Sequence, residues 1–344
     1  MRYRACVIGC GRVAWLLEDD PLETRPCTHM GAYTALSHRV KVIGAADVNN
    51  ERLISFGKRF GVKSMYLDYK EMLKEVSPDI VSVCAYAPDR SGMVMDSIEA
   101  GVKGIWCEKA FSASLEEARA MRNACSSNGV SLIVSHMRRW SGDYRKAKEI
   151  IDSGGIGKLQ SIICHFSGSL LHTGTHAFDI LNWFCGPAEW VEGRVENRPG
   201  NSAWDTDEDL GGRAVIHFRN GSYAMVSAES KNYFFFEFDV IGASGRIRIG
   251  NNDVLEYYRP GASAHYTGIK ELQEVPFPYF EKKNIWVEAL GNLIDSVEGS
   301  GRPADGPEEG LSSLELALAI HSSARQNGAR VYLPINNDIT VRSR

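Results

Sequence analysis

A short loop near the start of the chain, residues 9–14 (Gly-Cys-Gly-Arg-Val-Ala), has the spacing of a phosphate-binding turn. It follows an apolar run over residues 5–8 and opens into an expected helix. Gly9 allows the tight turn, Gly11 lets backbone approach a pyrophosphate, and Ala14 lets helix and strand pack closely. The start of the helix would offer N–H groups and a positive dipole end to a dinucleotide. The expected cofactor-binding residues of this loop are Gly9, Cys10, Gly11, Arg12 and Val13.

The second expected strand ends at an acid, Asp47. In a dinucleotide-binding unit, an acid at this place accepts a hydrogen bond from the ribose 2′-hydroxyl. Its charge would repel the 2′-phosphate of NADP, so we expect NAD as the cofactor and NADP to be less favoured. The alternative is an ordinary solvated acid at the end of a strand.

Glu108 and Lys109 follow another expected strand, residues 104–107. Ligands of open α/β sheets bind at the carboxyl ends of strands, which would place Lys109 beside one. Its ammonium group could lower the pKa of a reacting hydroxyl and hold the oxygen during hydride transfer, with Glu108 orienting the lysine. The alternative is a pair of surface charges, the commoner role of such a dipeptide.

A further polar group lies at residues 172–183. If Thr175 caps a helix, His176, Asp179 and Trp183 fall on one face at spacings of three and four residues. An apolar face would then contain Phe178, Leu181 and Cys185.

The imidazole of His176 is suited to take a proton from an alcohol near pH 7 as hydride leaves. Two other roles stay open for this group. His176 could be a hydrogen-bonded structural histidine, or His172, His176 and Asp179 could form a metal site.

The first 135 or so residues must position the glycine loop and Lys109, and they alternate apolar runs with helical patterns. This alternation is typical of a parallel sheet. The expected strands are residues 3–8, 40–46, 64–66, 80–85, 104–107 and 131–135. The expected helices are residues 51–60, 69–76, 93–100 and 115–126, the last with a capping box of Ser114 and Glu117. Between residues 14 and 40 we expect an exposed excursion, because prolines interrupt any single helix.

After about residue 156 the pattern changes to successive strands with short connections, which favour a mostly antiparallel sheet. The expected strands are residues 159–166, 190–196, 213–218, 223–227, 234–241, 246–249 and 254–258, and helices return at 281–298 and 311–326. The predicted fold class is α/β. An N-terminal Rossmann domain with a doubly wound parallel sheet precedes a C-terminal α/β domain with a large, mostly antiparallel open sheet.

The composition fits two globular domains, with 344 residues of which 44% are hydrophobic. The 39 basic and 43 acidic residues give a net charge of −4, so no broad basic surface is expected for nucleic acid or an anionic membrane. No apolar run reaches the ~18 residues of a membrane span, and the early first strand leaves no room for a signal peptide. The eight cysteines are scattered, so we expect reduced, buried thiols in a cytoplasmic protein.

Taken in order, these segments resemble the Gfo/Idh/MocA family of nicotinamide-dependent sugar and cyclitol oxidoreductases. The resemblance covers nearly the whole chain and rests on the order and spacing of its segments. They are residues 9–14, the stretch 100–103 leading to Glu108-Lys109, residues 155–158, the pattern Gly174-x-His176-x-x-Asp179 with Trp183, and the tail 290–295 followed by Gly299 and Arg302-Pro303.

The resemblance implies a Rossmann domain over residues 1–135 and a substrate-binding and oligomerisation domain over residues 136–344, whose terminal helices can pack back on the first domain. It implies that Lys109 lies near nicotinamide and substrate, that His176 serves as acid/base, and that Asp179 contacts or supports the substrate. Pro88, Glu108 and Lys109 join the glycine loop and Asp47 as expected cofactor-binding residues. The C-terminal sheet is expected to form a homodimer or homotetramer.

Three positions depart from the family pattern. Ala110 stands where the family usually has proline, so the turn geometry of that ring must be held in another way or is absent. His172 stands four residues before His176, where many members carry an Asp whose constant negative charge an imidazole cannot reproduce. Gly92 stands about where the family often shows a histidine.

The sequence therefore predicts an NAD(P)-dependent oxidoreductase that moves hydride between nicotinamide and a secondary hydroxyl or ketone of a small carbohydrate-like molecule. Lys109 would hold the oxygen and His176 would move the proton, with His172 and Asp179 as further catalytic candidates. His172 and Ala110 motivate an alternative, a catalytically weak NAD-binding regulatory or partner protein that retains the fold. A metal-dependent hydrolase or lyase using His172, His176 and Asp179 is a further alternative.

Overall fold

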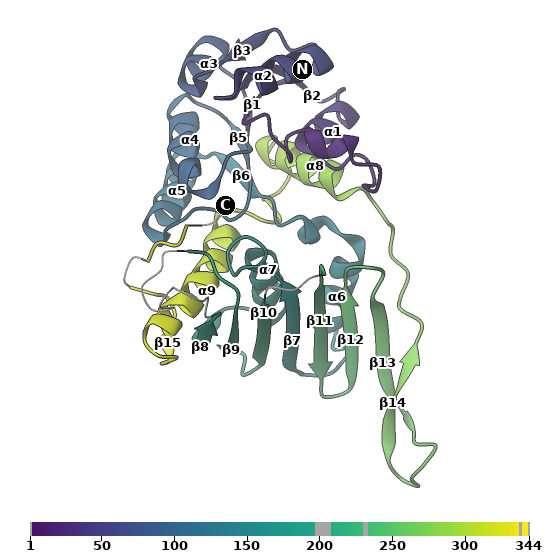
Figure 1. Cartoon of the computed structure of the whole chain (residues 1–344). Coiled ribbons are helices and arrows are strands. Elements are labelled where there is room, and N and C mark those ends of the chain that lie inside the picture. Colours follow the sequence, from purple (N-terminus) through teal and green to yellow (C-terminus); the bar gives the residue numbers. More distant parts are fainter. Residues whose placement is uncertain (1, 197–207, 230–232, 337–338, 343–344) are drawn as a thin grey trace. The chain divides into compact units, whose positions relative to one another are not determined.

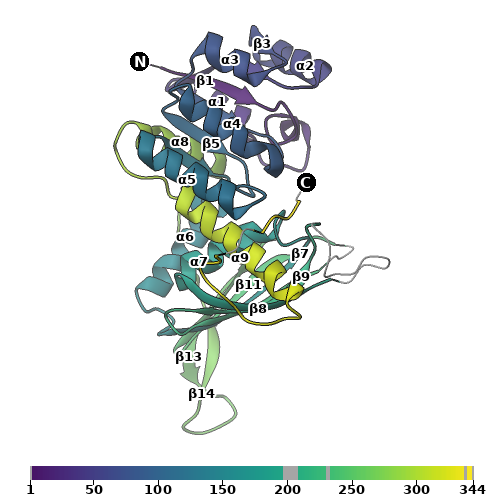
Figure 2. The same cartoon turned by 90° about the vertical axis from the view of Figure 1, so that its left-hand side faces the viewer.

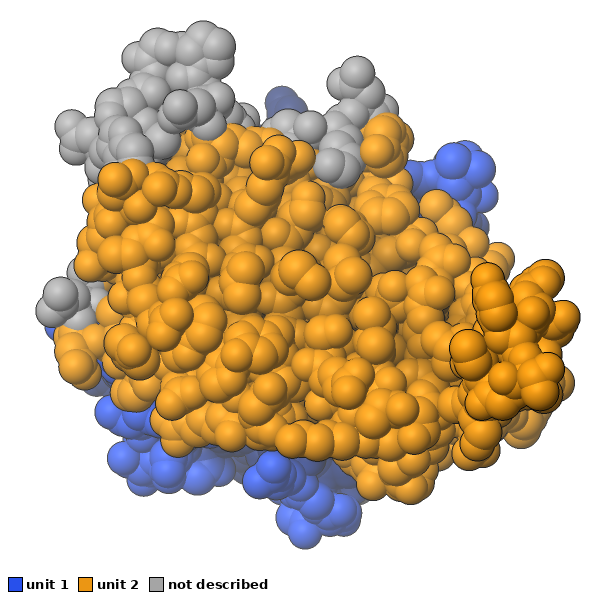
Figure 3. All heavy atoms as spheres, turned by 90° about the horizontal axis from the view of Figure 1, so that it is seen from below, with its two compact units in different colours: residues 1–140, 283–311, 343–344 blue, residues 141–282, 312–342 orange. Residues whose placement is uncertain are grey.

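The computed structural model describes residues 2–196, 208–229, 233–336 and 339–342. The chain forms two compact units, coloured blue and orange in Figure 3. Unit 1 comprises Met1–Trp140, Lys283–Leu311 and Ser343–Arg344, and unit 2 comprises Ser141–Lys282 and Ser312–Arg342. The expected domain boundary between residues 135 and 136 stays a prediction. Within the described ranges, no helix is both long and apolar enough to cross a membrane.

Unit 1 is built on a six-stranded parallel sheet with the strand order β3-β2-β1-β4-β5-β6 (Figure 1). The strands are β1 (Tyr3–Ile8), β2 (Val40–Ala46), β3 (Ser64–Tyr66), β4 (Ile80–Val83), β5 (Gly104–Cys107) and β6 (Ser131–Val134). All residues of β4 and β5 are buried, as expected for apolar strands covered on both faces. The predicted doubly wound sheet is confirmed, and its carboxyl ends lie along one edge.

Helices of unit 1, apart from α4 (Ala87–Glu99), begin after an N-cap residue whose side chain accepts a backbone hydrogen bond. They include α2 (Asn50–Phe60), α3 (Tyr69–Val76), α5 (Leu115–Asn128) and α8 (Ile285–Val297). The N-cap of α5 is Ser114, as predicted, and its hydroxyl accepts from the Glu117 N–H at 3.2 Å. This helix ends at Gly129, in the left-handed region at φ +64°. Although α8 is distant in sequence, its Leu290 and Leu293 are fully buried in the core of unit 1.

The structure corrects two expectations about residues 11–40. No α-helix follows the glycine loop directly, because residues 11–15 form turns that lead into a short 3₁₀ helix, η1 (Leu16–Asp19). The first α-helix, α1 (His29–Ala35), begins where the Thr28 hydroxyl accepts from the Gly31 N–H. The predicted exposed excursion is also wrong in part, because residues 21–25 are exposed whereas residues 27–30 are buried.

Unit 2 contains a nine-stranded sheet with the order β14-β13-β12-β11-β7-β10-β9-β8-β15. The strands are β7 (Leu159–Ser167), β8 (Ala188–Val195), β9 (Gly212–Phe218), β10 (Tyr223–Glu229), β11 (Phe236–Gly242), β12 (Gly245–Gly250), β13 (Leu255–Ala262), β14 (Lys270–Val275) and β15 (Val331–Tyr332). Only β10 and β7 pair in parallel among these neighbours, which confirms the mostly antiparallel prediction.

One face of this sheet is covered by helices, as Figure 2 shows for α6 (Gly142–Asp152) and α7 (Gly174–Cys185). Phe178 of α7 contacts the ring of Phe166 with centroids 6.1 Å apart, and Tyr144 of α6 contacts Phe238 at 6.3 Å. The remaining helix is α9 (Pro307–Arg325), and a second 3₁₀ helix, η2, spans Met137–Trp140. Side chains alternate along the strands, so every second residue belongs to the open face of the sheet.

Candidate active site

The glycine loop lies at the carboxyl ends of β1 and β4. The Gly9 N–H donates to the Ala46 carbonyl, and the Cys84 N–H donates to the Ile8 carbonyl, both at 2.8 Å. Gly9 has a φ of +88°, and a Cβ at this position would lie 2.7 Å from the Cys84 carbonyl oxygen. Only glycine satisfies both constraints, so the turn itself requires Gly9.

Gly11 leaves the loop open. A Cβ at Gly11 would meet no heavy atom closer than Arg52 Nη1, at 3.7 Å. This space suits a group that approaches the backbone closely, as a pyrophosphate does. Arg12 and Val13 continue the turn, so the N–H groups of this region belong to turn residues rather than to an α-helix terminus. The loop therefore fits a dinucleotide, without the helix dipole that the sequence suggested.

The loop is braced by Trp15, a residue that the sequence pattern did not single out. Its indole N–H donates to the Cys10 carbonyl at 2.9 Å. The indole also makes edge-to-face contacts with Phe56 and Phe60 of α2, at centroid distances of 6.5 and 5.9 Å. The position of the loop is thus tied to the core of unit 1.

Asp47 is a buried carboxylate, only 6% exposed, and is not the solvated acid of the alternative interpretation. One oxygen accepts from the Cys10 N–H at 2.7 Å, and the other accepts from the Asn49 N–H at 2.8 Å. Arg52 Nη1 lies 3.5 Å from the first oxygen. Since a carboxylate has about four acceptor positions, these bonds leave capacity for a ribose hydroxyl.

Glu108 lies at the end of β5, where its N–H donates to the Val83 carbonyl at 3.1 Å. Its side chain is buried, so the pair Glu108-Lys109 is not merely surface charge. Burial alone would raise the pKa of Glu108. The hydrogen bond from His29 and the charges of His29, Lys109 and Arg90 outweigh burial and lower this pKa to about 2. Glu108 is therefore an ionised acid beside a half-buried lysine.

Ala110 departs from the expected proline, yet the peptide bond between Lys109 and Ala110 is cis. The guanidinium of Arg90, on α4, donates a hydrogen bond to the Ala110 carbonyl. Arg90 is buried, and no sequence motif had drawn attention to it. Pro88 is exposed at the start of the same helix, two residues before Arg90.

In unit 2 the structure places His176 and Asp179 on α7, with Trp183 one turn further along the same face. The expected N-cap was wrong by two residues, because Thr173 is the N-cap and the Thr175 hydroxyl instead donates to the Leu171 carbonyl at 2.8 Å. Phe178, Leu181 and Cys185 are buried, as predicted for the apolar face. Asp179 is buried as well, whereas His176 is half-buried and His172 is exposed.

The loop before α7 is held by Asp209, a buried acid that sequence reasoning missed. Its carboxylate accepts from the backbone N–H groups of Leu171 and His172, each at 2.8 Å, and from the Ser169 hydroxyl at 2.7 Å. Burial alone would raise the pKa of Asp209. The hydrogen bonds from His321, the Ser169 hydroxyl and the two N–H groups outweigh burial, so the pKa of Asp209 is lowered. The backbone of His172 is therefore fixed while its side chain faces outward.

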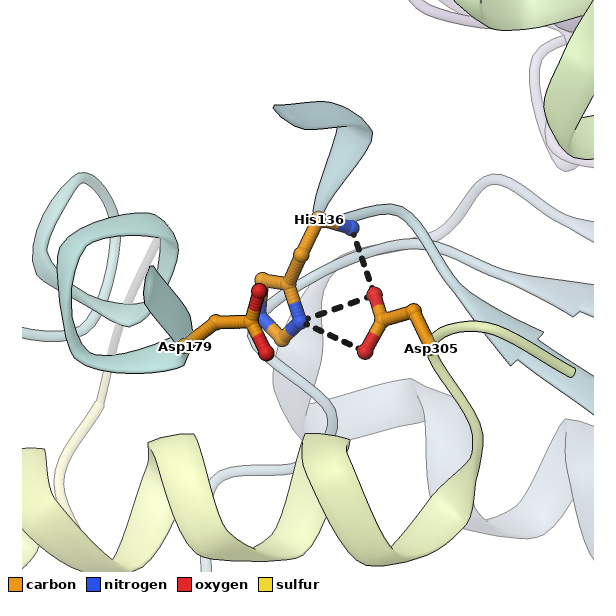
Figure 4. A group of neighbouring side chains, drawn as sticks. All are labelled: His136, Asp179 and Asp305. Carbon is orange, nitrogen blue, oxygen red and sulfur yellow. Dashed lines mark hydrogen bonds and ion pairs between the residues drawn. The ribbon is translucent and has the colours of Figure 1, made fainter. Parts of the chain in front are cut away.

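The ligand atoms of His172, His176 and Asp179 do not gather within 4.8 Å of one another, so the structure does not assemble the metal site that the spacing allowed. A different histidine of unit 1, His136, is paired instead with Asp305 (Figure 4). Its Nδ1 lies 3.0 Å from one Asp305 oxygen, and its backbone N–H donates to the same oxygen. This pair fastens the segment before α9 to the end of β6.

Comparison with known proteins identifies the chain. The GFO_IDH_MocA family model "Oxidoreductase family, NAD-binding Rossmann fold" matches residues 4–136, and its partner "Oxidoreductase family, C-terminal alpha/beta domain" matches residues 164–333. The chain belongs to the Gfo/Idh/MocA oxidoreductase family. The predicted family, the oxidoreductase class and NAD as the cofactor are confirmed.

Two curated relatives of this Gfo/Idh/MocA protein span nearly its full length. D-apiose dehydrogenase of Paraburkholderia graminis is 25% identical, over 94% of this chain and 88% of its own. The scyllo-inositol 2-dehydrogenase (NAD(+)) of Bacillus subtilis is 27% identical over 98% of both chains. The solved structure of a levoglucosan dehydrogenase in complex with NADH matches 97% of this chain and 100% of its own, with a TM-score of 0.79 and 18% identity. That structural likeness supports the fold.

Proposed function

We propose that this Gfo/Idh/MocA protein oxidises or reduces a secondary carbon of a sugar, sugar derivative or cyclitol with NAD. The observation that carries the proposal is the alignment of the glycine loop, Asp47 and the Glu108-Lys109 pair at the carboxyl edge of one parallel sheet. Bound NAD supplies the hydride acceptor. The names of the relatives, which act on apiose and inositol, support the substrate class.

Lys109 has the central role in this proposal. Its ammonium group holds the reacting oxygen and lowers the pKa of the alcohol, so that the proton leaves as hydride departs. The ionised Glu108 offsets the lysine charge and orients it. The glycine loop (Gly9, Cys10, Gly11, Arg12 and Val13) binds pyrophosphate, and Asp47 binds the ribose hydroxyl. Pro88 contributes to the cofactor site at the start of α4.

We assign the proton transfer to His176. A neutral imidazole accepts a proton from an alcohol near pH 7, and its position in the first turn of α7 is fixed by the Asp209 anchor before it. Asp179, three residues further on the same face, supports the substrate or the imidazole. His172 is the remaining candidate, since it stands four residues before His176.

Replacing Lys109 by Met tests the proposal. We expect the rate of NAD reduction with the best substrate of a panel of myo-inositol, scyllo-inositol and D-apiose to fall at least 100-fold, as for removal of a group that acts in the transition state. NADH affinity should stay nearly unchanged. Lys103→Met, which removes an exposed lysine paired with Asp79, is the matched control and should keep full activity.

Retained turnover in Lys109→Met would contradict the assigned role. Tight NADH binding by the wild-type protein with no turnover of any sugar or cyclitol would instead support the alternative, a catalytically weak NAD-binding regulator. His172 and Ala110, which depart from the family pattern, are the reason for testing this alternative.

We also propose that the open face of the unit 2 sheet forms a homodimer or homotetramer. Val215 on β9, Met225 on β10 and Ile163 on β7 lie side by side across this face, and Met225 is 49% exposed. Beside them, Trp190 stacks on His217, with centroids 5.2 Å apart. A row of exposed and half-buried apolar and aromatic side chains supports association.

Light scattering after size-exclusion chromatography tests this proposal. We expect the wild-type protein to be a dimer or tetramer and Met225→Glu to shift it to a smaller species. Leu22→Glu, at a 93% exposed position of unit 1, should leave the mass unchanged. A wild-type monomer would contradict the proposal.

The cysteines support a reducing compartment, and we propose the cytoplasm. All eight are free, and seven of them are buried.

A further inference from the structure

Both neighbours of Lys109 are held by buried side chains from other elements of unit 1. His29, at the start of α1, contacts the Glu108 carboxylate, and Arg90, on α4, contacts the Ala110 carbonyl. We propose that His29 and Arg90 are positioning residues that fix the direction of the Lys109 side chain. This inference rests on the proposed function, because it concerns the lysine to which that function assigns the reacting oxygen.

The His29 ring is fixed on all sides. Its Nε2 lies 3.2 Å from Glu108 Oε1, and its Nδ1 lies 3.0 Å from the Ser82 hydroxyl. The ring packs on Trp106 with centroids 3.9 Å apart and contacts Trp286 at 5.7 Å. The side chain is fully buried, so it cannot meet substrate or bulk water. It acts through Glu108.

The hydrogen bonds around His29 link four side chains of unit 1. The carboxylate of Glu108 is ionised and can only accept, so His29 Nε2 carries a proton and donates to it. Nδ1 of the same ring forms the hydrogen bond with the Ser82 hydroxyl. The Ser82 hydroxyl also forms a hydrogen bond with the Tyr33 hydroxyl, 2.9 Å away. Tyr33, Ser82, His29 and Glu108 thus each have a hydrogen-bond partner, which restricts movement of the Glu108 side chain.

Arg90 holds the other side of Lys109. It is 5% exposed, and its hydrogen bond goes to a backbone carbonyl rather than to a carboxylate. Among the described residues, its Nε has no hydrogen-bond partner. Burying a cation that is incompletely paired costs stability, so Arg90 is poorly explained as an ion pair that stabilises the fold. Its hydrogen bond to the Ala110 carbonyl instead gives Arg90 a role in fixing the backbone after Lys109.

Together these contacts hold the Glu108 side chain immediately before Lys109 and the Ala110 backbone immediately after it. A side chain that must hold a reacting oxygen loses activity when it is misplaced by about 1 Å, typically on the order of 100-fold. The two flanking contacts restrict such displacement without touching a ligand. They also offer a means of holding the turn at Ala110 without the proline that the family usually has there.

A pair of His29 variants separates positioning from packing. In His29→Gln the amide reaches as far as Nε2 and can still donate to Glu108, whereas in His29→Asn it reaches only as far as Nδ1 and keeps the Ser82 contact alone. We expect kcat to fall on the order of 100-fold in His29→Asn and to recover substantially in His29→Gln. NADH affinity and Tm should differ little between the two.

A readout independent of turnover is the NMR signal of ¹³C-dimethylated Lys109, assigned by its loss in Lys109→Arg. In the wild-type protein with NAD we expect it to be resolved from the signals of exposed lysines. In His29→Asn and in Arg90→Lys, which shortens the reach to the Ala110 carbonyl, it should move toward them. Should His29→Asn fail to fold, Arg90→Lys decides the matter by the same measurement.

The inference is overturned if folded His29→Asn and Arg90→Lys both keep the wild-type Lys109 signal. It is also overturned if His29→Asn slows the Lys109→Met variant as much as it slows the wild type, because residues that act through one lysine must have no separate effect once it is gone. Failure of the proposed function looks different, since Lys109→Met would then keep its turnover while the Lys109 signal still responds to His29.

Discussion

The backbone N–H of Cys10 donates to the carboxylate of Asp47 at 2.7 Å, so the acid at the end of β2 closes the glycine loop that follows β1. The two strands are neighbours in the sheet, with Ile8 opposite Ala46. Asp47 is therefore part of the loop's own structure as well as a candidate ribose ligand. Its two roles make one prediction about cofactor affinity and another about cofactor choice.

Removing the Asp47 carboxylate should weaken NADH binding. Asp47→Ala loses the acceptor of the Cys10 N–H and the candidate ribose contact, and hydrogen bonds to a charged group contribute about 1.5–3 kcal/mol. We expect the Kd for NADH to rise roughly 10- to 100-fold. The ratio of the Kd for NADPH to the Kd for NADH should fall. Fluorescence titration with both cofactors measures this.

Asp79→Ala is a matched control for Asp47→Ala. Asp79 also accepts a backbone N–H, that of Arg4 at 2.9 Å, but it lies at the opposite, amino end of β4. Its removal should lower Tm and leave the Kd for NADH unchanged. Equal Kd values in Asp47→Ala and the wild type would show that Asp47 has no part in cofactor binding.

The two glycines of the loop should respond differently to the same added methyl group. Gly9→Ala must accommodate a Cβ 2.7 Å from the Cys84 carbonyl oxygen at φ +88°, and the left-handed conformation alone costs about 1–2 kcal/mol. We expect a clearly lower free energy of unfolding. Gly11→Ala meets no atom within 3.7 Å and should keep its stability while binding NADH more weakly. Urea unfolding and NADH titration of both variants check this, and a reversed pattern would contradict it.

The sequence was informative where local chemistry decides the structure. Apolar runs located all six strands of the parallel sheet, and Ser114 with Glu117 located the start of α5. The glycine spacing located the turn at Gly9, because a positive φ beside a neighbouring carbonyl can be met only by glycine. These features depend on residues that are close in sequence or on a periodic pattern.

Two of the residues that the sequence missed act over long separations. His29 reaches Glu108 across 79 positions, and Asp209 reaches Leu171 across 38. Neither distance leaves a periodic signal. For His29, Thr28 as a capping residue was the available sign of a helix, but the prolines before it favoured an exposed segment instead. The expected helix directly after the glycine loop does not form. Turn hydrogen bonds, such as that from the Leu17 N–H to the Arg12 carbonyl, replace the hydrogen bonds of a continuous helix there.

Glu108 should make the protein sensitive to acid. Its pKa is about 2 in the folded protein against an ordinary value of 4.5, so the ionised form stabilises the fold above pH 4.5. That contribution is lost as the pH falls from 4.5 toward 2, because unfolding then takes up a proton. Within this window the slope due to Glu108 approaches about 1.4 kcal/mol per pH unit. Urea unfolding between pH 7 and pH 3 should therefore show a shallower loss of stability in Glu108→Gln than in the wild type.

Glu256→Gln is the control, because Glu256 also has a lowered pKa, through Tyr258, but belongs to the open face of the unit 2 sheet. Equal pH slopes for Glu108→Gln and the wild type would mean that His29, Lys109 and Arg90 do not hold Glu108 in its ionised form.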